Sequence, residues 1–164
     1  MQLSRNQRRL LALPILLALT ACGSDGGTES DNSSLPMPNV QTGSHNAGQN
    51  CMNSGCHDGS NQSTAKFTVG GTIYSSNSNV QTNATVRLYI HNTNTLVAEL
   101  TTDSSGNFYT TETIEGLSDG SGALVTGVNV EVQGPSGTRN MPGLITSGAC
   151  SGCHGQSNGR VTVN

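Results

Sequence analysis

Short apolar runs and polar turns alternate along residues 66–146, and this pattern predicts β-strands. The clearest run is Ala84-Thr-Val-Arg-Leu-Tyr-Ile90, in which every second residue is apolar. Successive side chains of a strand point to opposite faces, so the apolar residues should be buried together on one face. Thr85, Arg87 and His91 should then lie on the opposite, polar face.

Four more runs have strand character, and each is bounded by Gly, Asn, Asp or Ser residues that favour turns. They cover residues 66–74, 96–102, 108–114 and 124–132. Short strands at this spacing are typical of antiparallel sandwiches. We therefore expect a mainly β fold: a small antiparallel β-sandwich, with its core at about residues 66–146, flanked by loop-rich segments. Helical periodicity is confined to the N-terminal segment.

Residues 1–21 have the pattern of a signal peptide. Arginines at positions 5, 8 and 9 precede an apolar run at residues 10–19, which is too short to span a membrane. The run ends in Leu19-Thr-Ala-Cys22, which resembles the lipobox of bacterial lipoproteins. This resemblance implies cleavage before Cys22 and lipidation of that cysteine, which would anchor the protein to a membrane. The alternative is an ordinary secretory signal with a chance cysteine.

Residues 22–44 are rich in Gly, Ser, Asp, Asn and Pro and lack apolar periodicity, which predicts a flexible tether. Residue 23 is glycine rather than aspartate, and by the sorting pattern of lipoproteins this implies the outer membrane. The domain would face the periplasm or lie at the cell surface. The expected organisation is therefore a signal peptide, a tether and one domain over residues 45–164.

The composition indicates a thin hydrophobic core. Hydrophobic residues make up 32% of the chain and aromatic residues 3%, and tryptophan is absent. A covalently bound apolar group would add the bulk that the side chains lack. Without residues 1–21 the chain keeps 4 basic and 10 acidic residues, a formal charge of −6. This balance argues against nucleic acid as a partner, because nucleic-acid binding needs a basic face.

Two cysteine motifs carry the candidate chemistry. Cys150-Ser-Gly-Cys153-His154 has the C-x-x-C-H spacing of c-type haem attachment. Cys51-Met-Asn-Ser-Gly-Cys56-His57 repeats this pattern with two additional residues. In such a motif both sulfurs attach to one porphyrin edge, and the following histidine binds the iron as its proximal ligand. We expect the extra pair in the longer motif to bulge out, helped by the flexibility of Ser54-Gly55.

The two motifs resemble those of small multihaem c-type cytochromes, some of which combine C-x4-C-H with C-x-x-C-H sites. The resemblance implies two covalently bound haem c groups. The loop-rich segments that flank the sandwich would be c-type haem attachment segments, which makes residues 45–164 a haem-bearing domain. Their attachment residues would be four cysteines, Cys51, Cys56, Cys150 and Cys153, and their proximal iron ligands would be His57 and His154. With Cys22 in the lipobox, all five cysteines are assigned. The alternative is two disulfides or one zinc site in an exported protein.

The sequence offers several candidates for the sixth iron ligands. His45-Asn-Ala-Gly-Gln-Asn-Cys51 is similar to the H-x-x-G-x-x-C approach of multihaem cytochromes, which implies that His45 binds a neighbouring haem. The chain has four histidines, so His91 would complete a second bis-histidine pair. The alternatives are a solvated loop histidine at position 45 and an exposed strand histidine at position 91. Three methionines compete with them and would give a higher reduction potential: Met37, Met52 and Met141.

The predicted strands carry a second resemblance. Gly71-Thr-Ile-Tyr74, Ala84-Thr-Val-Arg-Leu88 and Thr102-Asp-Ser-Ser-Gly-Asn-Phe108 are similar to carboxypeptidase regulatory-like domains. This resemblance covers residues 67–133 and implies a small prealbumin-like sandwich with a scaffold or adhesion role. No H-E-x-x-H zinc peptidase motif occurs in the chain.

The expected function is electron transfer by an outer-membrane or cell-surface lipoprotein, with extracellular electron transfer as one form of it, and without turnover of a substrate. Its partners would be other redox proteins, with basic ones favoured by the acidic charge, and self-association is left open. One alternative is a non-redox surface module that binds carbohydrate or protein. Another is a haem-based enzyme or sensor, which needs an open axial position on the iron.

Overall fold

The computed structural model describes residues 43–164 of the chain. The predicted signal peptide and nearly all of the predicted tether, including Cys22 and Met37, lie outside the described residues. Within the described part, no helix is long and apolar enough to cross a membrane.

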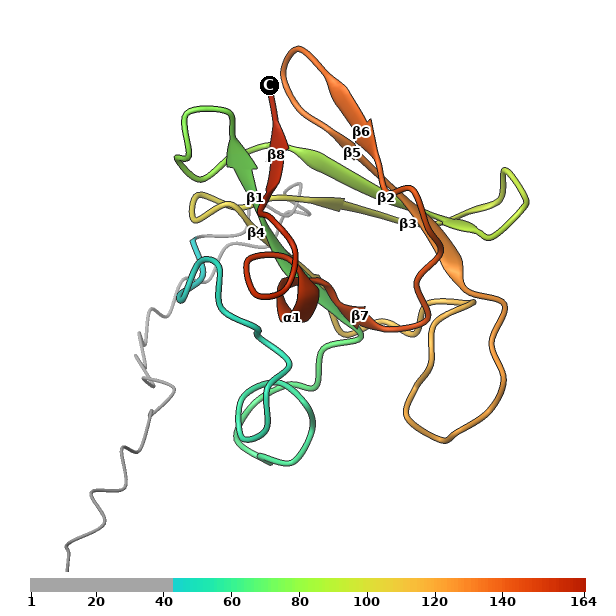
Figure 1. The fold of residues 1–164 in the computed structure, drawn as a ribbon. Coiled ribbons are helices and arrows are strands. Elements are labelled where there is room, and N and C mark those ends of the chain that lie inside the picture. Colours follow the sequence, from blue (N-terminus) through green and yellow to red (C-terminus); the bar gives the residue numbers. More distant parts are fainter. Residues whose placement is uncertain (1–42) are drawn as a thin grey trace, which may run out of the picture. The chain divides into compact units, whose positions relative to one another are not determined.

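The described residues form two four-stranded sheets (Figure 1). The first sheet consists of β1 (Val69–Ser75), β4 (Asn107–Thr110), β7 (Gly148–Ala149) and β8 (Val161–Val163). The second has the order β3-β2-β5-β6, with β3 at Leu96–Thr101, β2 at Thr85–Ile90, β5 at Val128–Gln133 and β6 at Thr138–Asn140. The one short helix, among the described residues, is α1 (Cys150–Cys153). The predicted mainly β fold class is confirmed.

The core lies between the two sheets and consists mainly of aliphatic side chains. The predicted alternation in β2 is confirmed, because Val86 and Leu88 are buried, as is Ala84 just before the strand. They pack with residues of both sheets and of the loops: Val69, Ile73, Phe108, Ile114, Leu117, Val128, Val132 and Val163. Each fully buried aliphatic side chain of this kind contributes roughly 1.5–3 kcal/mol.

β1 organises the first sheet. One of its edges pairs antiparallel with β4, and the other edge pairs in parallel first with β7 and then with β8. The sandwich therefore extends beyond residue 146, where the sequence pattern placed its end, and it includes parallel pairings besides the expected antiparallel ones. Val163 of β8 is buried in the core, but the run Val161-Thr-Val163 is too short to predict a strand.

Two predicted strands are shorter than expected. The run at residues 124–132 becomes a strand only from Val128, and Leu124 is fully exposed in the preceding loop. Gly127 has a positive φ of 80°, a conformation outside the β region, so the strand begins after it. The strand predicted over residues 108–114 ends at Thr110, the last residue of β4, although Ile114 still packs into the core from the loop.

Candidate functional site

The motif Cys150–His154 follows β7 and precedes β8, so it leaves the edge of β1 between two successive strand pairings (Figure 1). Its first four residues form the single turn of α1. The backbone N–H of His154 donates a hydrogen bond to the carbonyl oxygen of Cys150 at 2.9 Å. This closure brings both cysteines and the histidine onto one turn, as attachment to one porphyrin edge requires.

The longer motif, Cys51–His57, closes in the same way. The backbone N–H of His57 donates to the carbonyl oxygen of Cys51 at 3.0 Å, although two more residues lie between them. An inner turn, from the N–H of Cys56 to the carbonyl of Asn53, takes up the extra length, and Gly55 has a positive φ of 83°. The predicted bulge therefore exists. Because of it, the first cysteine and the histidine form the same backbone hydrogen bond as in the shorter motif.

The two motif histidines are also anchored alike through their side chains. Nδ1 of His57 lies 2.8 Å from the carbonyl oxygen of Ala65, and Nδ1 of His154 lies 3.0 Å from that of Gly159. A carbonyl oxygen only accepts hydrogen bonds, so each Nδ1 is the donor, and the neutral tautomer that makes this bond has its lone pair on Nε2. Metal-binding histidines show this arrangement, in which the second ring nitrogen is tied to a backbone oxygen.

His45 lies next to His57 of its own motif, with the two ring centroids 6.2 Å apart and the ring planes 33° from parallel. Two imidazoles on opposite sides of one metal ion, each with its nitrogen about 2 Å away, have centroids roughly 6 Å apart. The side-chain amide of Asn107 donates to the carbonyl oxygen of His45 at 3.1 Å and holds this segment in place. The resemblance implied a neighbouring haem for His45, whereas the structure brings it to the adjacent motif.

An aromatic stack supports the His57 ring. Phe67 lies on His57 with a centroid distance of 3.8 Å and an angle of 6° between the rings. Tyr109 stacks on Phe67 at 4.6 Å. The sequence did not point to either aromatic residue, because they come from separate strand regions and meet only when β1 and β4 pair. The stack fixes the orientation of the His57 ring.

The two motifs lie against neighbouring glycines of β1. A Cβ on Gly70 would lie 3.7 Å from Cβ of Cys51, and a Cβ on Gly71 would lie 2.9 Å from Cβ of Cys150. Adjacent strand residues face opposite sides of a sheet, so Cys51 lies on the outer face and Cys150 on the face toward the core. The motif segments also lie close together, because a Cβ on Gly152 would come within 3.1 Å of Nδ2 of Asn50.

The cysteines differ in environment. Cys51, Cys150 and Cys153 are free thiols, whereas Cys56 is disulfide-bonded, so haem attachment at the longer motif would require reduction first. Burial raises the pKa of the Cys150 thiol to about 12 and also raises that of Cys51. Both thiols are therefore protonated at neutral pH in the folded chain.

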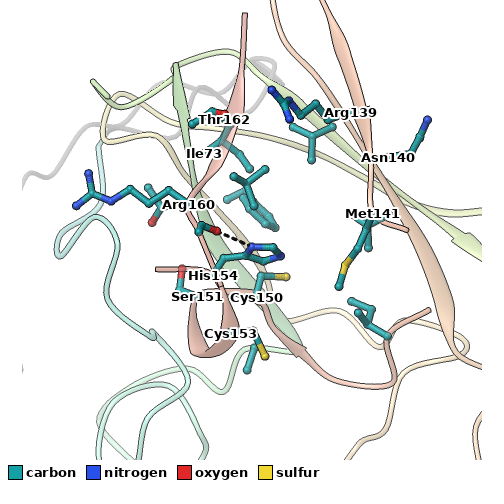
Figure 2. Close-up of a pocket in the computed structure, with 18 of the residues that line it drawn as sticks. Ile73, Arg139, Asn140, Met141, Cys150, Ser151, Cys153, His154, Arg160 and Thr162 are labelled. Carbon is teal, nitrogen blue, oxygen red and sulfur yellow. Dashed lines mark hydrogen bonds between the residues drawn. The ribbon is translucent and has the colours of Figure 1, made fainter. Parts of the chain in front are cut away.

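A cavity of about 230 Å³ lies between the sheets beside the shorter motif (Figure 2). Apolar side chains of both sheets line it, among them Ile73, Phe108, Val130 and Val132. Cys150, Cys153 and His154 also line it. The donor set and the apolar lining fit a thioether-linked macrocycle that is partly enclosed, since Cys153 at the rim is exposed.

His91 lies elsewhere in the fold. It follows β2, is half-buried, and its Nδ1 lies 3.0 Å from the side-chain oxygen of Asn129. It is not among the residues that line the cavity beside His154. The structure therefore brings His45 and His57 together but does not place His91 at either motif.

Residues 43–164 contain no group of three or more His, Cys, Asp or Glu side chains placed to hold a bare metal ion. Comparisons with known protein families, with curated proteins and with solved structures found no match to this chain. The cytochrome and carboxypeptidase regulatory-like resemblances therefore stay predictions.

Proposed function

We propose that this protein is a dihaem c-type electron carrier, anchored as a lipoprotein at the outer membrane or cell surface. The observation that carries the proposal is the common construction of the two motifs. In both, the histidine N–H closes onto the carbonyl of the first cysteine, and Nδ1 donates to a backbone carbonyl. Two segments of different length and different sequence share this construction, which prepares each Nε2 to bind a metal.

Each motif would hold one haem through its own residues. Cys51 and Cys56 would supply the thioether sulfurs of the first site, and Cys150 and Cys153 those of the second. When bound, haem supplies one-electron chemistry through its iron. The chain contributes the orientation of the proximal histidines and, at the second site, an apolar wall that limits access of water.

The pairing of His45 with His57 supports electron transfer rather than substrate chemistry. Their centroid distance of 6.2 Å matches two imidazoles that share one iron. An iron with two protein ligands in its axial positions has no open position for oxygen or a substrate. This observation weighs against the alternative of a haem enzyme or sensor at the first site.

The closeness of the motif segments supports transfer between the two sites. Asn50 directly precedes Cys51, and its Nδ2 would lie 3.1 Å from a Cβ on Gly152, which lies between the cysteines of the second motif. The partners would be other redox proteins, which the acidic chain meets most readily when they are basic.

The test is a haem count on the full-length protein, matured in cells that carry a cytochrome c assembly system. A pyridine haemochrome assay together with intact mass should show two covalent haems per chain. The paired variants Cys51→Ser/Cys56→Ser and Cys150→Ser/Cys153→Ser should each lose one of them, since thioether formation needs the sulfurs.

The serine variants also identify the outcomes that contradict the proposal. A colourless protein of unmodified mass would favour the non-redox surface module. A single haem could also be found that is kept in Cys51→Ser/Cys56→Ser and lost in Cys150→Ser/Cys153→Ser. In that case only the shorter motif would bind haem, and the proposal of a dihaem carrier would be wrong.

A further inference from the structure

The cavity beside the second motif has two walls from different sheets. Cys150 and His154 belong to the segment that links β7 to β8 in the first sheet. Met141 lines the other side and directly follows β6 of the second sheet. Figure 2 shows the Met141 thioether and the His154 ring both turned toward the cavity. A group bound between these walls would therefore meet one side chain from each sheet.

Few of the lining side chains are able to bind haem iron. The cysteines of the motif are committed to the thioether bonds, and His154 is the motif's own ligand. Among the described residues that line the cavity, Met141 supplies the one remaining thioether and no second imidazole is present. His91, the ligand expected from the count of histidines, is hydrogen-bonded to Asn129 outside this lining.

Met141 is held in place by the sheet rather than by a mobile loop. Its backbone N–H donates to the carbonyl oxygen of Val130 at 2.9 Å, which continues the pairing of β5 with β6 by one residue. The side chain is half-buried against an apolar lining, an environment that suits a polarizable thioether. Its position is therefore set by the same core that shapes the cavity.

We propose that Met141 is the axial ligand opposite His154 at the second site, an inference that rests on the proposed haem function. The first site would then be ligated by His45 and His57, and the second by His154 and Met141. Methionine in the axial position raises the reduction potential of a c-type haem. The two sites would therefore differ in potential, with the second one higher.

The test compares the matured full-length protein with two methionine variants, Met141→Leu and the control Met52→Leu, which lies within the first motif. A ferric haem with a methionine ligand shows a weak sulfur-to-iron charge-transfer band at the red end of the spectrum. We expect this band in the wild type and in Met52→Leu, and its loss in Met141→Leu. Ferrous Met141→Leu should also bind carbon monoxide, because its second iron has lost a ligand.

Met141→His gives a second, independent measurement if the leucine variant folds poorly. It should keep both axial positions filled, and the higher of the two midpoint potentials should fall toward the lower one in a spectroelectrochemical titration. Two haems by the haemochrome assay without a methionine band, or a band that survives Met141→Leu, would overturn the ligation alone. Absence of the haem at Cys150 and Cys153 would overturn the proposed function at this motif and the inference with it.

Discussion

At the scale of single residues, Asp103 holds the segment that carries His45. Its buried carboxylate accepts hydrogen bonds from four donors: the N–H and hydroxyl of Ser44, the N–H of Ser105 and the N–H of Asn107. Burial acts to raise the pKa of Asp103, but hydrogen bonds from Ser44, Asn107 and Ser105 outweigh it, so the pKa lies below its ordinary value. The folded state therefore favours the charged form.

This shift predicts acid sensitivity with a definite sign. A carboxyl whose pKa is lowered by folding stabilises the folded state. This contribution to the free energy of unfolding is complete above the unfolded pKa of about 3.9 and is lost as the pH falls through the folded pKa. In urea unfolding at pH 6 and at several values below 4, wild type should lose stability more steeply than Asp103→Asn. The variant should already be less stable at pH 6, by about 1–3 kcal/mol, because an amide cannot accept from every donor.

Glu112→Gln is the matched control for loss of one carboxylate, because Glu112 is exposed. The stability of Glu112→Gln should fall with decreasing pH as steeply as that of wild type. Parallel curves for wild type and Asp103→Asn would show that the hydrogen bonds to Asp103 do not set the acid sensitivity.

At the scale of elements, β1 depends on the absence of a side chain at one position. A Cβ on Gly71 would lie 2.8 Å from Cζ of Phe108 and 2.9 Å from Cβ of Cys150. A Cβ on Gly70 would lie no closer than 3.5 Å to its neighbours, which is ordinary contact. Glycine inside a strand often marks such a close approach by another segment.

The two glycines form a matched pair for mutation. Gly71→Ala should destabilise the fold by about 1–3 kcal/mol, because Phe108 or the second motif must move to admit the methyl group. Gly70→Ala should leave the free energy of unfolding nearly unchanged. Both values are measured by urea unfolding of the same preparation, and equal stabilities of the two variants would mean that Cys150 does not pack on Gly71.

The elements also show what a sequence is able to predict here. β2 is predictable because apolar and polar residues alternate along its six residues. This alternation indicates both that the segment is a strand and which of its faces is buried. β8 is not, since three residues carry too little pattern, and it becomes a strand only because the edge of β1 is available. Likewise, spacing alone predicts the motif residues, whereas the placement of His45, His91 and Met141 depends on how the sheets and loops meet.

At the scale of the whole molecule, the chain carries a net negative charge. Residues 43–164 contain 4 basic and 7 acidic residues, and the preceding predicted tether adds three acidic ones. Arg87, the basic residue in the middle of β2, is already paired with Glu99 and Glu131 on the adjacent strands. The field at longer range is therefore negative.

Electron exchange with a basic redox partner should consequently slow as salt is added. We expect the second-order rate to fall on the order of tenfold between low and physiological ionic strength. Stopped-flow mixing with one basic and one acidic cytochrome of similar potential measures it. The acidic partner should show the opposite trend, and salt-independent rates with both would exclude electrostatic steering.

The position of the second motif between β7 and β8 also bears on the order of assembly. Residues 150–154 emerge before residues 161–163, so during synthesis the cysteines are present while half of the β1 edge is still open. In the folded chain Cys150 is half-buried beside the cavity that Val161 and Thr162 of β8 also line, so detachment of β8 would expose it further. The thiol-labelling rate of Cys150 in the unloaded protein should therefore rise when the last strand opens, and covalent loading should be easiest before that strand has docked.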